Sequence, residues 1–211
     1  MCPPATGAHK ALPYGIHSTF ILCGGFYMNT LYCLGDSLTY GLGVRTSEKW
    51  TSLVASRRLR TVNLGVPGDT TAGMLARLQK LLPEARGEAV LLLGGSNDIF
   101  FTGSDLCARN NMAAMVHQLL SAGCRVYVGL PLPIDAASAP KKWASLADFA
   151  KANETLQAFR CWLVCFCEAF DVPVVDFAQD YVNREDLYLD GLHPNAAGHR
   201  QMADRLLEAL K

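Results

Sequence analysis

The chain has 211 residues, of which 50% are hydrophobic, enough to bury one sizeable core in a single domain. Its 19 basic and 19 acidic side chains give a formal net charge of zero without a run of like charges, so the sequence predicts no nucleic-acid partner. The eight cysteines form no CxxC pair and no metal-ligand spacing. This pattern favours reduced thiols in a cytoplasmic protein and predicts no metal site.

Residues 1–27 differ in composition from the rest of the chain. They contain prolines and glycines without a helical or strand period, and their one apolar patch is interrupted by Gly24 and Gly25. That patch is too short to span a membrane, and the segment lacks the basic region and cleavage site of a signal peptide. We therefore expect an irregular leader over residues 1–27, a folded domain over residues 28–211, and no transmembrane segment.

From residue 28 onward, short apolar runs alternate with segments of helical period. The runs are apolar at nearly every position, which is typical of parallel strands buried on both faces. Long helices are expected over residues 145–170 and 195–210. The expected strands span residues 30–34, 61–64, 89–93, 125–130 and 172–177. Strands that are each followed by a helix predict an α/β fold, a three-layer α/β/α sandwich with a five-stranded parallel sheet.

Polar and glycine-rich segments follow the expected strands. Ligands of such sheets bind beyond the carboxyl ends of the strands, so these segments are expected to share one edge. The segments read, in chain order, GDS at 35–37, GVPGDT at 65–70, GGSND at 94–98, PLPID at 131–135 and, ahead of the last helix, DGLHPN at 190–195. A serine, glycine turns, an asparagine and an Asp/His pair are thereby brought to one edge of the predicted sheet.

These residue types match the needs of a serine hydrolase. A serine hydroxyl is a weak nucleophile unless a base takes its proton, and His193 is the candidate base for Ser37. Asp190, three residues before His193, is expected to orient the imidazole. The backbone N–H groups of Ser37 and Gly68 and the side-chain amide of Asn97 would donate to an oxyanion.

Each of these residues also has a simpler interpretation when it is taken alone. Ser37 is then a helix N-cap, Gly68 a turn glycine, Asn97 a loop or cap residue, and His193 a structural or exposed histidine. The simpler interpretations weaken together, because all of the residues fall at one sheet edge in roles that a hydrolase requires.

Three of the segments resemble the sequence blocks of the GDSL-type, or SGNH, hydrolases. They are GDSLTYG at 35–41, GGSNDI at 94–99 and DGLHPN at 190–195, and the four residues of the family name are matched by Ser37, Gly68, Asn97 and His193. The run NLGVPGDT at 63–70 is similar to that of the bacterial acyl-thioesterase and lysophospholipase branch. The resemblance covers residue 29 to the C-terminus. It implies a flavodoxin-like fold and ester hydrolysis through an acyl-enzyme, without a metal or other cofactor.

The substrate is expected to be a small-molecule acyl ester, with short-chain acyl or acetyl esters favoured. The alternatives are thioester or lysophospholipid substrates with longer acyl chains, and a non-catalytic binding protein of the same fold. A nucleotide- or flavin-binding protein is disfavoured, because no G-x-G-x-x-G or P-loop lysine follows the first strand. Nothing in the sequence specifies an oligomeric state. The expected lining of the acyl pocket is Tyr40, Ile99, Phe100, Phe101, Leu132, Pro133, Ile134 and Leu192.

Overall fold

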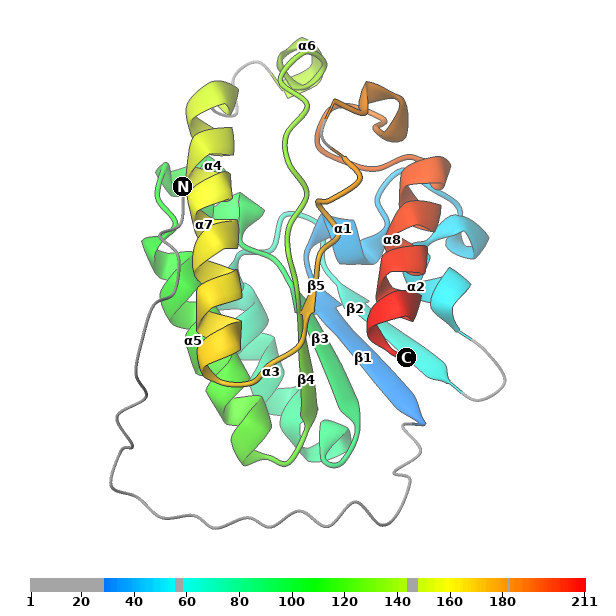
Figure 1. The fold of residues 1–211 in the computed structure, drawn as a ribbon, viewed down its shortest axis with the longest axis vertical. Coiled ribbons are helices and arrows are strands. Elements are labelled where there is room, and N and C mark those ends of the chain that lie inside the picture. Colours follow the sequence, from blue (N-terminus) through cyan, green and yellow to red (C-terminus); the bar gives the residue numbers. More distant parts are fainter. Residues whose placement is uncertain (1–28, 56–58, 144–147, 182) are drawn as a thin grey trace, which may run out of the picture.

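The computed structural model describes residues 29–55, 59–143, 148–181 and 183–211, so the leader expected over residues 1–27 lies outside it. The described residues form a five-stranded sheet in the order β2-β1-β3-β4-β5, with every neighbouring pair parallel (Figure 1). The predicted parallel sheet is confirmed. Its strands are β1 (Thr30–Gly35), β2 (Arg60–Gly65), β3 (Ala89–Leu93), β4 (Arg125–Gly129) and β5 (Val174–Val175).

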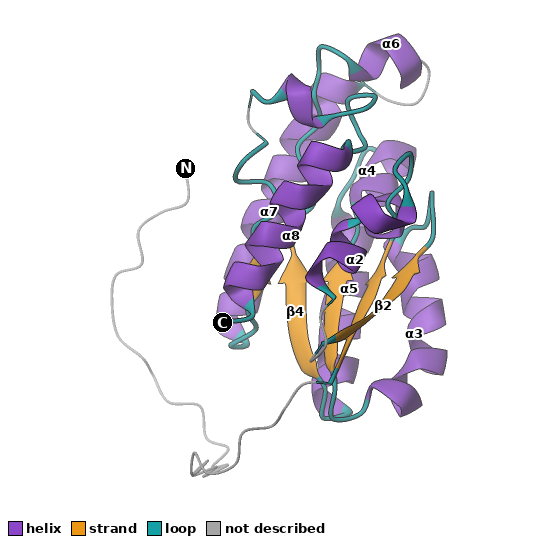
Figure 2. Ribbon diagram, turned by 90° about the vertical axis from the view of Figure 1, so that its right-hand side faces the viewer, coloured by secondary structure: helices purple, strands orange, loops and turns teal. Residues whose placement is uncertain are grey.

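Helices cover both faces of the sheet, which confirms the three-layer sandwich. Helices α3, α5 and α7 lie on one face and α2 and α8 on the other, and Figure 2 shows the strands pointing together toward the end that carries α4 and α6. The helices are α1 (Ser37–Tyr40), α2 (Trp50–Val54), α3 (Thr71–Ala85), α4 (Ser96–Thr102), α5 (Leu106–Ser121), α6 (Ala139–Trp143), α7 (Phe149–Ala169) and α8 (Ala196–Ala209), with 3₁₀ turns η1 (Thr46–Glu48) and η2 (Glu185–Leu187).

Strand β3 explains why the apolar runs do not alternate with polar residues. Its side chains point to opposite faces in turn, so Val90 and Leu92 pack under α3, α5 and α7, whereas Leu91 and Leu93 pack under α2 and α8. All four are fully buried. A helical layer on each face therefore requires an apolar residue at every position of the strand.

Two of the expected elements differ from the structure more than the others, and both are shorter in it. The strand expected over residues 172–177 pairs only at Val174 and Val175, because Pro173 lacks an N–H and Asp176 turns the chain by accepting from Ala178 N–H. The helix expected from residue 145 begins at Phe149, where the Asp148 side chain caps it by accepting from Lys151 N–H. Residues 144–147 lie outside the described residues.

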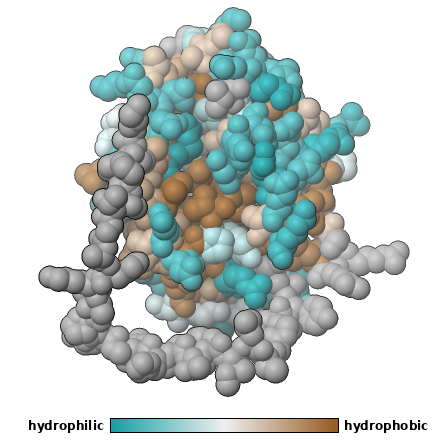
Figure 3. Space-filling view, in the orientation of Figure 1, coloured by the Kyte–Doolittle hydropathy of each residue, from teal (hydrophilic) through white to brown (hydrophobic). Residues whose placement is uncertain are grey.

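The face of the molecule drawn in Figure 3 has an apolar centre near the short strand β5. On this face apolar side chains gather in the centre, where Figure 1 places β4 and β5, and hydrophilic side chains flank them. Strand β4 pairs with β5 only at Val128 and Gly129. The short edge strand thus leaves apolar surface between two polar flanks.

A fully buried histidine joins α8 to α2. The Nδ1 atom of His199 accepts a hydrogen bond from the backbone N–H of Trp50 at 3.3 Å, and its Nε2 has no partner among the described residues. Burial, with the nearby charges of Lys49 and His193, lowers the pKa of His199 from 6.5 to about 4. Folding therefore favours the neutral imidazole.

Acidification is expected to destabilise the fold through His199. Between about pH 6.5 and about pH 4 the unfolded chain binds a proton that the folded chain excludes, so the free energy of unfolding falls as the pH is lowered. The contribution approaches ~1.4 kcal/mol per pH unit in this window. In His199→Asn, the side-chain oxygen keeps the acceptor for Trp50 and does not titrate. In urea unfolding from pH 7 to pH 4.5, the wild type should lose stability relative to the variant as the pH is lowered; a difference between the two proteins that stays constant with pH would contradict the assignment.

Candidate active site

Ser37 is the first residue of α1, directly beyond the carboxyl end of β1. The helix is capped by Asp36, whose Oδ1 accepts from the Leu38 N–H at 2.9 Å. The interpretation of Ser37 as the N-cap is therefore wrong by one position. Because the neighbouring carboxyl group provides the cap, the Ser37 hydroxyl is free for another partner.

The loop between η2 and α8 presents Asp190 and His193. Its two sides are joined by backbone hydrogen bonds from Leu189 N–H to the His193 carbonyl and from Asn195 N–H to the Leu187 carbonyl, each 2.8 Å long. Asp190 Oδ1 also accepts from the backbone N–H groups of Leu192 and His193. These bonds fix the turn that sets the carboxylate against the imidazole.

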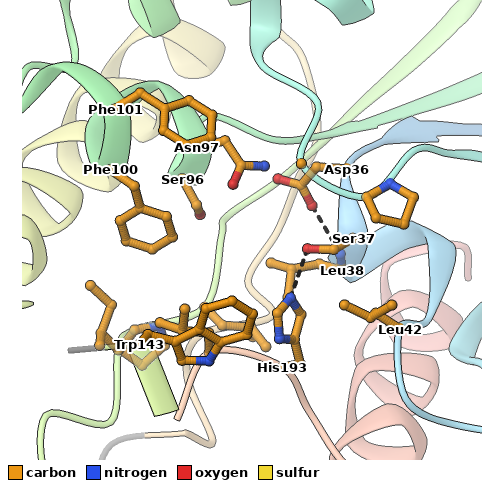
Figure 4. A pocket seen from close by; sticks show the side chains of 16 residues that line it. Asp36, Ser37, Leu38, Leu42, Ser96, Asn97, Phe100, Phe101, Trp143 and His193 are labelled. Atoms are coloured by element: carbon orange, nitrogen blue, oxygen red, sulfur yellow. Dashed lines mark hydrogen bonds between the residues drawn. The ribbon is translucent and has the colours of Figure 1, made fainter. Parts of the chain in front are cut away.

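Ser37, His193 and Asp190 form a hydrogen-bonded chain, of which Figure 4 shows the bond between Ser37 and His193. Ser37 Oγ lies 3.0 Å from His193 Nε2, and His193 Nδ1 lies 2.9 Å from Asp190 Oδ2. A carboxylate can only accept, so Nδ1 carries the proton and Nε2 is left to accept from the hydroxyl. Burial alone would raise the pKa of Asp190, but its hydrogen bonds to His193 and Leu192 lower it to about 2. The carboxylate therefore stays charged at neutral pH.

Gly68 and Asn97 lie at the same sheet edge and line the same pocket. Gly68 has a φ of +76°, which L side chains rarely adopt, and the turn around it leads into α3. The Asn97 side chain donates to the Asp69 carbonyl at 2.8 Å, which joins α4 to this turn. The described residues offer no acceptor to the Gly68 N–H or to the second N–H of the Asn97 amide.

A pocket of about 340 Å³ opens beside Ser37 and His193. Six of the eight expected pocket residues line it, namely Phe100, Phe101, Leu132, Pro133, Ile134 and Leu192. Tyr40 and Ile99 do not. Residues 96–102 form helix α4, and on this helix Ile99 points into the core, where it is 1% exposed. Tyr40 ends α1 in solvent, with the Lys49 ammonium over its ring.

The structure adds pocket residues that the sequence analysis missed. Leu38, Leu42, Pro67, Ser96 and Trp143 also line the cavity, and the Trp143 ring lies 5.9 Å from the His193 ring. Trp143 ends α6, which is only five residues long and therefore shows no helical period in the sequence. The sequence feature that could have drawn attention to this position is a large aromatic residue, Trp143, directly after two lysines.

Helix α6 is packed directly against the loop that carries Asp190 and His193. The Asp135 N–H donates to the Gly191 carbonyl at 2.9 Å, and a Cβ atom at Gly191 would lie 2.3 Å from the Ala139 nitrogen. Gly191 also has a φ of +85°. Only glycine fits this position without displacing α6.

No three His, Cys, Asp or Glu side chains in the described ranges gather so as to hold a metal ion. Within the same ranges, no helix has the length and apolar character needed to cross a membrane.

Known proteins resemble this chain in sequence. The model of the GDSL-like lipase/acylhydrolase family matches residues 33–201. Esterase TesA of Pseudomonas aeruginosa is 35% identical over 111 residues, which cover 49% of this chain and 55% of the relative, so the match spans about half of that protein. Thioesterase 1/protease 1/lysophospholipase L1 of Escherichia coli K12 is 25% identical, over 87% of this chain and 84% of the relative.

The fold itself has solved counterparts. A lipolytic protein of the G-D-S-L family from Veillonella parvula superimposes with a TM-score of 0.74 at 21% identity, covering 85% of this chain and 96% of that one. The chain belongs to the GDSL-like lipase/acylhydrolase family, because the family model matches most of its length. The predicted family is confirmed.

Behind Asn97, a buried carboxylate joins α4 to α3. Asp98 is 3% exposed and accepts from both the backbone N–H and the hydroxyl of Thr71, at 2.9 and 2.7 Å. The Asn111 side chain donates to the same hydroxyl at 3.0 Å. Thr71 therefore links the helix that follows the Gly68 turn to the helix that carries Asn97.

Replacing Thr71 with valine is expected to destabilise this junction. The change removes the hydroxyl partner of both Asp98 and Asn111, and an unsatisfied buried polar group costs roughly 1–3 kcal/mol. Thr71→Ser keeps the hydroxyl and is the matched control. Urea denaturation should show the loss in Thr71→Val and little of it in Thr71→Ser. A loss in Thr71→Ser without one in Thr71→Val would mean that the methyl group, which valine retains, is important and the hydroxyl is not.

Proposed function

We propose that this protein is a serine carboxylic ester hydrolase that works through an acyl-enzyme. The observation that carries the proposal is the continuous chain of hydrogen bonds from Ser37 Oγ through His193 to Asp190, at 3.0 and 2.9 Å. These hydrogen bonds lie beside an apolar pocket, and the protein belongs to the GDSL-like lipase/acylhydrolase family. Both facts support the same conclusion.

The geometry supports the following steps. Ser37 Oγ attacks the acyl carbon while its proton passes to His193 Nε2, and charged Asp190 stabilises the imidazolium. The tetrahedral intermediate collapses as His193 returns the proton to the leaving oxygen, which departs as the alcohol and leaves the acyl group on Ser37. Water then attacks the acyl-enzyme, with His193 again taking and returning a proton, and the carboxylic acid is released.

Three donors are assigned to the oxyanion. They are the backbone N–H groups of Ser37 and Gly68 and the free side-chain N–H of Asn97. The bond from Asn97 to the Asp69 carbonyl holds the amide in place before the reaction, so little reorganisation is needed as the charge develops. One such donor is typically worth roughly 10²–10³ in rate.

We assign short-chain acyl esters as the substrates. The apolar walls formed by Phe100, Ile134 and Leu192 suit an acyl chain, and the volume of about 340 Å³ lies at the low end of the roughly 300–1,000 Å³ of ligand pockets. The second candidate is a longer acyl chain, as a thioester or lysophospholipid. It is favoured by Phe101, which is 60% exposed at the pocket and would contact a chain that extends beyond it.

Replacing Ser37 with alanine is expected to reduce hydrolysis of p-nitrophenyl acetate at least about a thousandfold, because no nucleophile remains. Ser121→Ala, at the exposed end of α5, is the control and should retain wild-type rates. Mass spectrometry after exposure to a fluorophosphonate should place the label on Ser37. Activity of Ser37→Ala within tenfold of wild type would rule out this mechanism.

A series of p-nitrophenyl esters from acetate to palmitate tests the substrate assignment. We expect kcat/KM to rise up to fourfold for each added methylene while the chain fills the pocket, since burying one methylene contributes ~0.8 kcal/mol. It should then fall for palmitate, whose tail would extend into solvent. A value that still rises from octanoate to palmitate would instead support the second candidate.

A further inference from the structure

Asp36 is a buried carboxyl group beside Ser37 that the proposed reaction does not use. It is 1% exposed, and its Oδ1 accepts a single hydrogen bond, from the Leu38 N–H. Its Oδ2 is inaccessible to water and has no hydrogen-bond partner among the described residues. An ionised carboxylate has lone pairs for about four donors, so this environment solvates a charge poorly.

The charged groups around Asp36 do not compensate for a negative charge there. Two further carboxylates, Asp69 and Asp98, act on it from the turn before α3 and from α4, and His193 acts from the opposite loop. The nearby cation, Arg77, is bound by Asp69 at 2.7 Å and gives its remaining bonds to backbone carbonyls. In the described part of the structure, Asp36 forms no ion pair.

The position of Asp36 also conflicts with a charge. It directly precedes Ser37, and Figure 4 draws its carboxyl group between the side chains of Ser37 and Asn97, two of the residues assigned to the oxyanion. A carboxylate at this place would repel the negative charge that develops on the substrate oxygen, and the low dielectric of a buried site would strengthen the repulsion.

Building on the proposed function, we propose that Asp36 carries a proton in the working enzyme. As a neutral carboxylic acid it still caps α1 through Oδ1, and so positions the Ser37 backbone, but it adds no negative charge next to the oxyanion. Asp36 is thus a positioning residue whose protonation state controls the rate. Burial, reinforced by Asp69 and Asp98, raises its pKa to about 7 despite the bond from Leu38 and the proximity of His193.

This assignment predicts a decrease of activity with rising pH. As the pH passes the raised pKa of Asp36, the group ionises and kcat falls. Between pH 3.8 and about 7 the unfolded chain loses the Asp36 proton that the folded chain keeps, so the free energy of unfolding falls as the pH rises through this interval.

Infrared spectroscopy tests for the proton without relying on catalysis. At pH 6 most carboxyl groups are ionised, so the C=O band of a protonated acid should be visible in the wild type and absent from Asp36→Asn. The band should also disappear at pH 9. Asp204→Asn removes an exposed carboxylate on α8 and should leave the band in place. A wild-type spectrum at pH 6 without a band assignable to Asp36 would overturn the proposal.

Kinetics test the effect on the reaction. Asp36→Asn keeps an acceptor for Leu38 N–H and cannot ionise, so the ratio of kcat at pH 9 to kcat at pH 6 should increase at least about fivefold over wild type. Asp36→Ala, which loses the cap, should lose kcat at all pH values. Identical pH profiles for wild type and Asp36→Asn would overturn the proposal. So would a hundredfold loss of kcat at every pH in an Asp36→Asn variant with a native circular dichroism spectrum.

The two proposals fail in distinguishable ways. If the wild type hydrolysed no ester, the proposed function would fail, while the infrared band would still report whether Asp36 is protonated. If Ser37→Ala abolished activity but the band were missing, the serine mechanism would stand and the assignment of Asp36 would not.

Discussion

The parallel direction of all five strands is the constraint on which the site depends. Because the strands run the same way, every segment that follows one of them emerges at the same edge of the sheet. Ser37 follows β1, Gly68 follows β2 and Asn97 follows β3. His193 reaches the same edge from beyond β5, so the Ser37–His193 hydrogen bond joins residues 156 positions apart.

Hydrogen bonds of the Arg77 side chain connect several of the segments at this edge of the sheet. Its guanidinium donates to the Leu64 and Gly35 carbonyls, at the ends of β2 and β1, and to the Asp69 carboxylate in the Gly68 turn. The carbonyl of Asp69 in turn accepts from Asn97. One side chain on α3 therefore connects two strand ends with the turn and the helix assigned to the oxyanion. Such preorganised donors are effective because they do not have to move during the reaction.

The sequence was sufficient to predict the features of the fold and of the site that depend on hydrophobic periodicity and on motif spacing. Uniformly apolar runs predicted the strands, and the motifs around Ser37, Asn97 and His193 predicted which loops would meet. The sequence was less informative where tertiary contacts decide the direction of a side chain or the residue that caps a helix. The direction in which Ile99 points depends on residues 96–102 being a helix, and the role of Asp36 as the cap depends on the geometry of α1.

Short elements account for the other differences between expectation and structure. Helix α6 has five residues and β5 has two, too few for a repeat to be recognised. Trp143, at the end of α6, was therefore missed although it packs beside His193. The raised pKa of Asp36 is likewise a property of its buried surroundings and has no signature in the chain itself.

The close packing of Gly191 on Ala139 has a mechanical consequence. It joins the α6 wall of the pocket, including Trp143, to the turn that carries His193, and the hydrogen bond from Asp135 N–H to the Gly191 carbonyl strengthens this contact. Displacing this wall would shift the imidazole as well. In the proposed mechanism, a bulky acyl group that displaced α6 would also move His193 away from Ser37, so such a substrate would be rejected by misalignment of these two groups as well as by steric exclusion.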